Sequence, residues 1–273
     1  MPCTMSWWLF PPQTREVQFD EKWSFVGKKQ EHCQEQEQDG DDPSRPRQGD
    51  NWDHVAFDPE HRLVVAVVPG KRTAQNCREL VREFRQRTGG RIMRLMTSDE
   101  YPSYKVAIHD VYGLRSVPLV VLPRPSGRAC APRKRVPAKL NYAMVHKHRD
   151  KNGHVTQIGL EVVFGSEESV ATALKQSSAS KVINTSFIER YNGTDRHRNA
   201  RKARRTYRFS KDWQVHEGMT YFTMYCYNFC WPVRTLSVKD PSGRRRQRTP
   251  AMCAGLSDHV WPVQEWMTLP ARQ

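Results

Sequence analysis

Apolar and polar side chains alternate along residues 17–26, the first regular pattern in the chain. One face carries Val17, Phe19, Trp23 and Phe25, and the other carries Gln18, Asp20, Lys22 and Ser24. Alternation with a period of two is typical of a β-strand, because successive side chains of a strand point to opposite faces of the sheet. The pattern therefore predicts a first strand with Asp20 on its polar face.

Two further strands and a helix follow this segment. Residues 53–57 and residues 62–68 predict the strands, and the unbroken aliphatic run within the second segment suits a central strand buried on both faces. The helix is expected to begin near Thr73 and to end at Gly89-Gly90, because glycine commonly terminates helices. Three strands thus precede the first helix.

Strands and helices alternate in the rest of the chain. We expect a strand at 92–97 followed by Asp99, a helix ending at Gly113, strand-like runs at 140–146 and 156–164, a helix at 167–176, and a helical tract from 187 to 229 broken near 209–212. The two strand-like runs are either an insertion or a fifth strand with an extension. This order predicts a mixed sheet flanked by helices, an α/β (α+β) domain.

The excess of basic residues predicts the kind of partner that the protein binds. Lysine and arginine outnumber aspartate and glutamate by 44 to 29 among the 273 residues, which leaves a net charge of +15. Residues 114–149 contain no acidic residue, and residues 190–211 contain only Asp195. Two long basic blocks predict a phosphate-binding surface and nucleic acid as the partner, with anionic lipid a distant second because no basic amphipathic anchor is present.

The sequence excludes a membrane-spanning segment. Its longest aliphatic run, residues 63–68, is far shorter than the ~20 residues that a membrane helix needs. The 7 cysteines are an odd number, which favours reduced thiols over a disulfide framework. We therefore expect no membrane association and a cytoplasmic, nucleoid-associated location.

Three carboxylates occupy positions suited to chemistry. Asp20 lies on the first strand, Asp99 follows the fourth, and Glu189 lies in the first turn of a basic helix. Three convergent acids hold two divalent ions about 3.5–4 Å apart in enzymes that cleave phosphodiesters, and hard oxygen ligands suit Mg²⁺ or Mn²⁺. On the residues alone, ordinary salt bridges and helix caps are the more common role for such acids.

The sequence around each acid resembles a known family. Residues 20–27 (DEKWSFVG), 97–102 (TSDEYP) and 184–193 (NTSFIERYNG) are similar to the three acidic motifs of DDE transposases of the insertion-sequence-one type. The resemblance covers roughly residues 17–214. It implies a ribonuclease H-like fold with a mixed five-stranded sheet, and a transposase that hydrolyses and transfers DNA strands. It also implies that Asp20, Asp99 and Glu189 are the catalytic and metal-binding triad for two Mg²⁺ or Mn²⁺ ions.

A set of residues is expected to contact DNA. The resemblance implies this role for Arg190, Asn192 and Arg196, and the basic blocks add Arg201, Lys202, Arg204, Arg205, Arg133, Lys134 and Arg135. Lys147 and Arg149 also favour phosphate contact. Glu21 is expected to point away from Asp20 because neighbours on a strand face opposite sides, and Asp195 is expected on the surface of its helix.

The predicted organisation has three parts. Residues 1–14 form a loose tail, residues 15–230 form the catalytic domain with a basic insertion at about 114–166, and residues 231–273 form a carboxyl-terminal helical tail. Related transposases carry a zinc-binding and helix-turn-helix region before the catalytic domain, whereas only 19 residues precede Asp20 here. The expectation is a shortened product that binds duplex DNA at element ends and target as a homo-oligomer.

Two alternatives remain open on the sequence. The first is a truncated or degenerate transposase product that binds DNA without catalysis. The second is a structure-specific nuclease on the same fold, which cleaves without joining.

Overall fold

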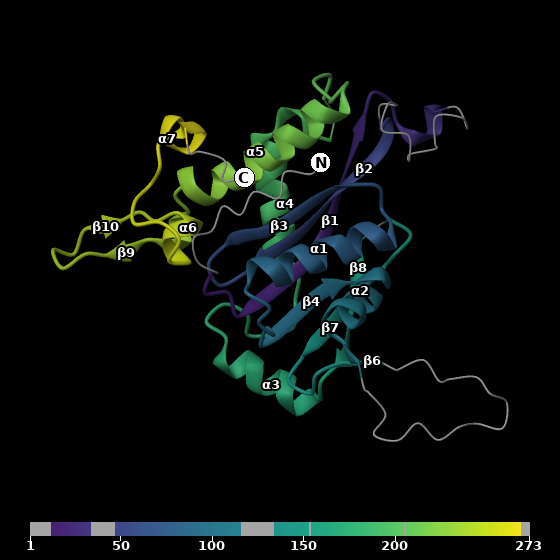
Figure 1. Cartoon of the computed structure of the whole chain (residues 1–273), viewed down its shortest axis with the longest axis vertical. Helices are drawn as coiled ribbons and strands as arrows, with labels where there is room; N and C mark the ends of the chain where they lie inside the picture. The colour runs from purple at the N-terminus through teal and green to yellow at the C-terminus, as the bar shows by residue number, and fades with distance from the viewer. Residues whose placement is uncertain (1–11, 34–46, 116–133, 153, 205, 269–273) are drawn as a thin grey trace.

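A six-stranded mixed sheet forms the centre of the molecule (Figure 1). The computed structural model describes residues 12–33, 47–115, 134–152, 154–204 and 206–268. The strands are β1 (Glu16–Val26), β2 (Gly49–Asp58), β3 (Leu63–Gly70), β4 (Leu95–Asp99), β7 (Tyr142–Arg149) and β8 (Val155–Phe164), in the spatial order β3-β2-β1-β4-β7-β8. Neighbours β1, β4 and β7 run parallel, and the other pairs are antiparallel. The mixed α/β prediction is confirmed.

The predicted number of five strands is wrong. The hairpin of β7 and β8 is not an insertion beside the sheet, because β7 pairs with β4 and β8 extends the same sheet by one edge strand. Most of the rest of the expected insertion, residues 116–133, lies outside the described residues. Its ends form the short strands β5 (Leu114–Arg115) and β6 (Lys134–Arg135), which pair only with each other.

Helices cover both faces of the sheet. Phe19 of β1 contacts Phe84 of α1 (Ala74–Arg87) and Tyr104 of α2 (Ser103–Tyr112), so these two helices share one face. Its neighbour Gln18 accepts a hydrogen bond from the backbone N–H of Ile188, which places α4 (Ser186–Arg198) on the other face. That second face also carries α5 (Trp213–Cys230), against β3, and α3 (Glu167–Gln176), against Leu95 of β4.

Local capping explains where most helices begin. Thr73 caps α1 by accepting a hydrogen bond from the Asn76 N–H, and Ser166 does the same for α3 through the N–H of Ser169. The predicted helices at these positions are confirmed, as is the one that ends before Gly113. None of the described helices has the length and apolarity that crossing a membrane requires.

The long helical tract is interrupted earlier than its sequence predicts. Helix α4 ends at Arg198, and Asn199 uses its side chain to accept from the Arg201 N–H at the start of the 3-10 helix η3 (Ala200–Lys202). A side chain that competes for backbone groups in this way ends regular helix. Among the described residues, no helix follows η3 until Asp212 caps α5, so the basic block does not continue along one helix.

Both predicted tails belong in part to the folded domain. Pro12 and Thr14 are buried, so the expectation of a loose tail is wrong for these positions. In the carboxyl-terminal region, Trp261 and Trp266 pack on two phenylalanines of α5. Trp261 contacts Phe229, and Trp266 contacts Phe222. This region contains η4 (Arg234–Leu236), β9 (Val238–Lys239), β10 (Arg245–Arg246), α6 (Pro250–Cys253) and α7 (Val263–Thr268). The remaining short element is η1 (Gln30–His32).

A single amide joins α5 to the edge strand β3. Register between β2 and β3 shifts after Ala56, so that Phe57 pairs with Val64. The buried side chain of Asn228 accepts from the Val64 N–H at 3.0 Å and donates to its carbonyl at 2.8 Å. Asn228 therefore satisfies both backbone groups of Val64 on the edge strand, as a neighbouring strand would at that position.

Replacing Asn228 is expected to leave two buried backbone groups without partners. Asn228→Ala should lower the free energy of unfolding by about 2–4 kcal/mol, because an unsatisfied buried polar group costs about 1–3 kcal/mol. Urea unfolding followed by circular dichroism measures the change. Gln214→Ala, an exposed position on the same helix, is the control and should stay within about 0.5 kcal/mol of the parent. An equal effect of the two substitutions would contradict the role given to Asn228.

Candidate active site

The parallel pairing of β1 with β4 brings the first two predicted acids together. Ser98 lies opposite Phe19 in the register of the two strands, so Asp99 comes beside Asp20. The preceding residues on the same face are Gln18 of β1 and Thr97 of β4. Both side chains donate a hydrogen bond to the backbone carbonyl of Asn184, just before α4. Asp20 and Asp99 therefore open toward the face that α4 covers, at the carboxyl end of β4.

Glu21 lies on the opposite face of β1 from Asp20, as predicted, where its charge raises the pKa of Cys77 in α1 and of Tyr104 in α2. It nevertheless comes close to the pair of aspartates. Carboxylate oxygens of Asp20, Glu21 and Asp99 all lie within 4.8 Å of one another. The reason is that β4 stops at Asp99, so no neighbouring strand separates the two faces of the sheet beyond this point. Arg72 holds one oxygen of Glu21 at 2.8 Å, while Asp20 turns back to accept the Glu21 backbone N–H at 2.8 Å.

Burial and mutual repulsion perturb all three acids. Burial, followed by the charges of Asp99 and Glu21, raises the pKa of Asp20 to about 8. Burial and Asp99 likewise raise the pKa of Glu21 to about 7, although Arg72 opposes the shift. The pKa of Asp99 is also raised, mainly by burial. Carboxylates crowded in this way favour the binding of protons or of a metal cation.

Two oxygens in the cluster lack a hydrogen-bond partner. They are the buried Oε2 of Glu21 and the buried Oδ1 of Asp99. Buried polar atoms are normally satisfied, so two orphaned acceptors beside a third carboxylate need an explanation. Hard carboxylate oxygens are the ligands that Mg²⁺ and Mn²⁺ prefer, and the donor set therefore fits the ions predicted from the sequence.

Glu189 faces the same region without entering the cluster. It lies in the first turn of α4, about half exposed, where it accepts a hydrogen bond from the Thr185 hydroxyl at 2.7 Å and pairs with the ammonium of Lys147. Its charge contributes to the raised pKa of Asp20 and of Asp99. Arg72, followed by Lys147 on β7, opposes the raised pKa of Asp99, so two cations border the acids.

Contacts between β1 and α4 hold the acids in place. Successive polar residues of β1 meet successive turns of the helix: Gln18 bonds Ile188, Asp20 bonds Asn192, and Lys22 bonds Asp195. The amide of Asn192 donates to Asp20 at 2.7 Å and is buried, so its expected role in contacting DNA is replaced by support of Asp20. Asp195 is buried too, which corrects its predicted place on the helix surface.

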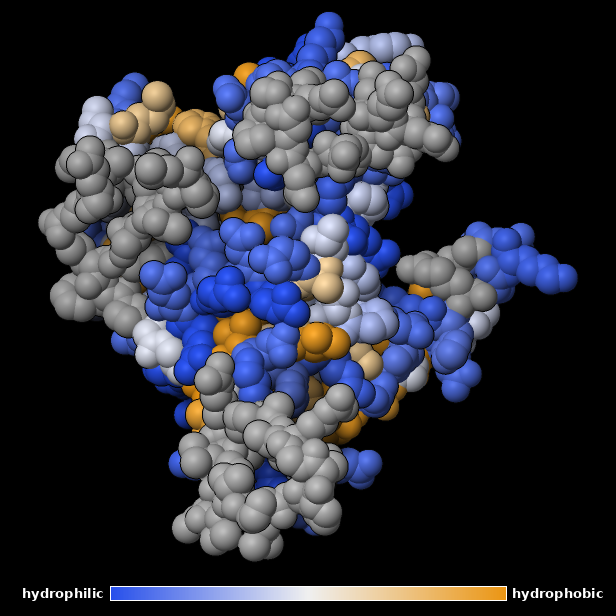
Figure 2. All heavy atoms as spheres, turned by 45° about the vertical axis from the view of Figure 1, so that its right-hand side comes forward, coloured by the Kyte–Doolittle hydropathy of each residue, from blue (hydrophilic) through white to orange (hydrophobic). Residues whose placement is uncertain are grey.

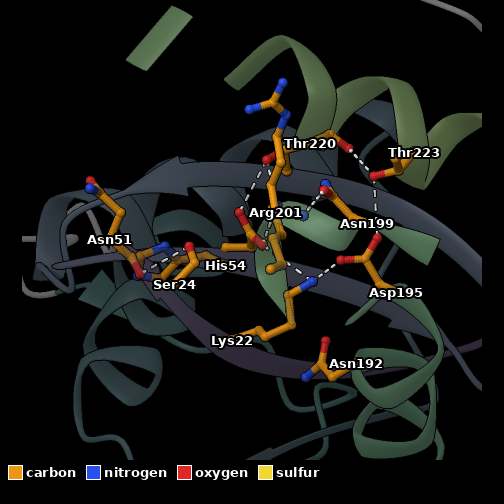
Figure 3. A network of polar contacts seen from close by, with 12 residues as sticks. Lys22, Ser24, Asn51, His54, Asn192, Asp195, Asn199, Arg201, Thr220 and Thr223 are labelled. Atoms are coloured by element: carbon orange, nitrogen blue, oxygen red, sulfur yellow. Dashed lines mark hydrogen bonds and ion pairs between the residues drawn. The ribbon is translucent and has the colours of Figure 1, made fainter. Parts of the chain in front are cut away.

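A buried ionic network lies next to these contacts (Figure 3). Its charged members are Lys22, Asp53, Asp195 and Lys202, each at most 3% exposed. Lys202 lies 2.6 Å from Asp53, and Lys22 lies 3.3 Å from Asp53 and pairs with Asp195. Lys202 is therefore not available to DNA, and its predicted contact is wrong because the chain after α4 folds back onto β2.

The network balances two cations against two anions inside the protein. Burial alone would raise the pKa of Asp53, but Lys202 and Lys22 hold it well below its usual range. Burial lowers the pKa of Lys202. A buried charge that loses its partner is strongly destabilising, so each member depends on the others.

Removing Asp53 is expected to destabilise the fold in a pH-dependent way. Asp53→Asn leaves Lys202 without a carboxylate, and the free energy of unfolding should fall by about 3–5 kcal/mol at neutral pH. The unpaired lysine has a lower pKa in the folded than in the unfolded state, so the loss should shrink as pH rises toward 10 and the amine becomes neutral. Urea unfolding at several pH values measures both effects.

The control for this experiment is an ion pair at the surface. Asp110 pairs with Arg78 at 2.9 Å, and both side chains are 32% exposed. Asp110→Asn should cost no more than about 1 kcal/mol, without the pH trend. A loss at Asp53 as small as that at Asp110 would show that the buried network contributes little.

The other predicted DNA contacts are spread over different surfaces. Arg190 and Arg204 are exposed, whereas Arg196 is half-buried. Burial, followed by the charge of Arg204, lowers the pKa of Arg196, and the nearby charge of Asp20 opposes this shift. Arg201 is half-buried and belongs to η3. Arg133 and Arg205 lie outside the described residues.

Lys134 and Arg135 lie apart from the acids. Lys134 donates to the carbonyl of Asp110 near the carboxyl end of α2, a helix whose other end follows Asp99. Ten helical residues span about 15 Å, so this pair does not belong to the acidic site. Arg135 is exposed.

Comparison with protein-family models and with curated proteins finds no match to this chain. The function of the site is therefore argued from its chemistry and from the motif resemblance.

Proposed function

We propose that this protein is a metal-dependent DNA strand-transfer enzyme of the DDE transposase type. The observation that carries the proposal is the cluster of Asp20, Glu21 and Asp99, with two orphaned buried oxygens, next to a helix that presents Glu189 and basic residues. Acids concentrated at a strand end and bordered by cations suit a reaction on a phosphodiester.

The strand order supports the same proposal. Three antiparallel strands, β1 to β3, precede the first helix, and the parallel strands β4 and β7 follow on the other side of β1. This is the order that the resemblance to a ribonuclease H-like transposase domain implies. The added edge strand β8 extends that arrangement beyond β7, so β7 separates it from β4 and β1.

Asp20, Asp99 and Glu189, with Glu21 as a further candidate, would hold Mg²⁺ or Mn²⁺. Divalent ions bound there would lower the pKa of an attacking water or of the 3′-hydroxyl of the DNA and would neutralise charge on the leaving oxygen. The residues of the chain have separate tasks: Asn192 orients Asp20, and Arg72 orients Glu21. Lys147 balances the charge of Glu189 and could contact a phosphate beside the acids.

One face of the molecule is predominantly hydrophilic among the described residues (Figure 2). Figure 2 shows one face of the molecule on which hydrophilic residues predominate and hydrophobic ones form smaller areas between them. Arg190 and Arg204 are exposed, and their charges suit the phosphate contacts that supply sequence-independent affinity for duplex DNA. We therefore propose double-stranded DNA as the substrate, in line with the net charge of +15.

Loss of any of the three triad acids is expected to abolish nicking. Asp20→Asn, Asp99→Asn and Glu189→Gln should each lower Mn²⁺-dependent nicking of supercoiled DNA by at least about 100-fold, because each change removes a metal-ligand charge. Glu100→Gln is the matched control, since that acid pairs with His146 outside the cluster. Nicking that survives all three triad substitutions would refute the proposal, and cleavage without joined products would favour a nuclease.

Metal binding can be measured without catalysis. Mg²⁺ or Mn²⁺ should raise the midpoint of thermal unfolding of the parent protein, because a ligand that binds only the folded state stabilises it by mass action. Asp20→Asn and Asp99→Asn should abolish most of this rise, and Glu21→Gln reports whether the fourth acid takes part. Equal metal-dependent rises in the parent and in both Asp variants would place the ions elsewhere.

A further inference from the structure

An open hollow lies on the surface between η3 and the start of α5. It has a volume of about 550 Å³ and is lined chiefly by Arg201, Tyr207, Arg208, Phe209, Lys211 and Val215. That volume falls within the range of roughly 300–1,000 Å³ found for sites that bind small molecules. The hollow belongs to the second basic block, but it is separate from the acidic cluster.

One side of the hollow presents an aromatic ring that is entirely in solvent. Tyr207 is 100% exposed, whereas Phe209, two residues later, packs on Phe25 of β1 with ring centroids 5.0 Å apart. The N–H of Gly27 also donates to the Ser210 carbonyl at 2.7 Å. The segment is thus anchored to the end of β1 on one side of Tyr207, while the ring itself is left available for stacking.

Positive charge surrounds this ring. Arg208 and Lys211 are exposed and Arg201 is half-buried. Asp212 is the one acid among the lining residues, and its carboxylate already accepts the Val215 N–H as the cap of α5. The hollow therefore combines three cations with a free aromatic face, the combination by which proteins bind unpaired nucleotides through backbone contacts and base stacking.

We infer that this hollow binds an unpaired nucleotide of the DNA, with its base stacked on Tyr207 and its phosphates held by Arg208 and Lys211. The inference rests on the proposed function for DNA as the partner. Duplex backbone alone would need the cations but not the ring, and an acidic peptide would likewise leave the ring unused. An unstacked base accounts for both features because every base offers a face to an aromatic ring.

The position of the hollow agrees with DNA that also reaches the acids. Val26, which bridges to Ser210, is six residues beyond Asp20 on the same strand, or roughly 20 Å at about 3.3 Å per residue. The rise of B-DNA is about 3.4 Å per base pair, so the unpaired nucleotide would lie about six positions from the reacting phosphate. Strand separation at that distance would distort the duplex near the site of cleavage.

Binding in EDTA tests this inference independently of catalysis. The full-length protein is titrated with a fluorescent 20-base-pair duplex and with the same duplex carrying four unpaired thymines at its centre. The parent should bind the unpaired probe about ten-fold more tightly. Tyr207→Ala should remove most of that preference and leave duplex affinity unchanged, because only the stacking contact is lost. Tyr207→Phe should keep the preference, because the ring remains.

Arg190→Gln is the matched control, because Arg190 is exposed, lies outside the hollow and is proposed to contact the duplex backbone. It should weaken both probes equally and reduce the salt dependence of binding, as expected for a phosphate contact. Equal affinity of the parent for the two probes, or equal losses on both probes in Tyr207→Ala, would overturn the inference. Asp20→Asn should keep the probe preference while losing nicking, so failure of the hollow and failure of the proposed catalysis are distinguishable.

Discussion

The structure depends on burial of the polar face of β1. Gln18, Asp20 and Lys22 are directed not into water but against α4, where each has a partner on a successive turn. Removing a lysine and several acids from water is costly, and only complete pairing offsets that cost. Asp53, Asp195 and Lys202 provide the pairing, so the positions of α4, η3 and α5 are tied to one strand.

This constraint also shapes the candidate active site. Because the α4 contacts determine where Asp20 and Glu189 lie, the acids remain close despite their repulsion. A raised pKa for Asp20, Glu21 and Asp99 means that the folded state holds these groups at a cost. Such crowding persists in a protein when the rest of the fold compensates for it, and the ion pairs beside it supply that compensation.

Sequence patterns predicted the regular elements well and the contacts less well. The strand at β1, the capped helices α1 and α3 and the stop at Gly113 follow from local rules of period, capping and glycine, and the structure agrees. Glu21 lies on the predicted face, but its closeness to Asp20 and Asp99 was not predicted, because strict alternation assumes a neighbouring strand and β4 ends beside it. Lys202 was predicted to contact DNA, but it pairs with the buried Asp53 of β2. A run of basic residues does not reveal such an acid on a distant element.

The sequence by itself determined the order of strands and helices, the basic character and the three motifs that contain Asp20, Asp99 and Glu189. These properties depend on residues close together in the chain. Only the tertiary structure decided that Asp20 and Asp99 are neighbours, that Glu21 joins them, and that Tyr207 is left free beside three cations. Those outcomes depend on strand register, strand length and the ion pairs between distant segments, which no local pattern specifies.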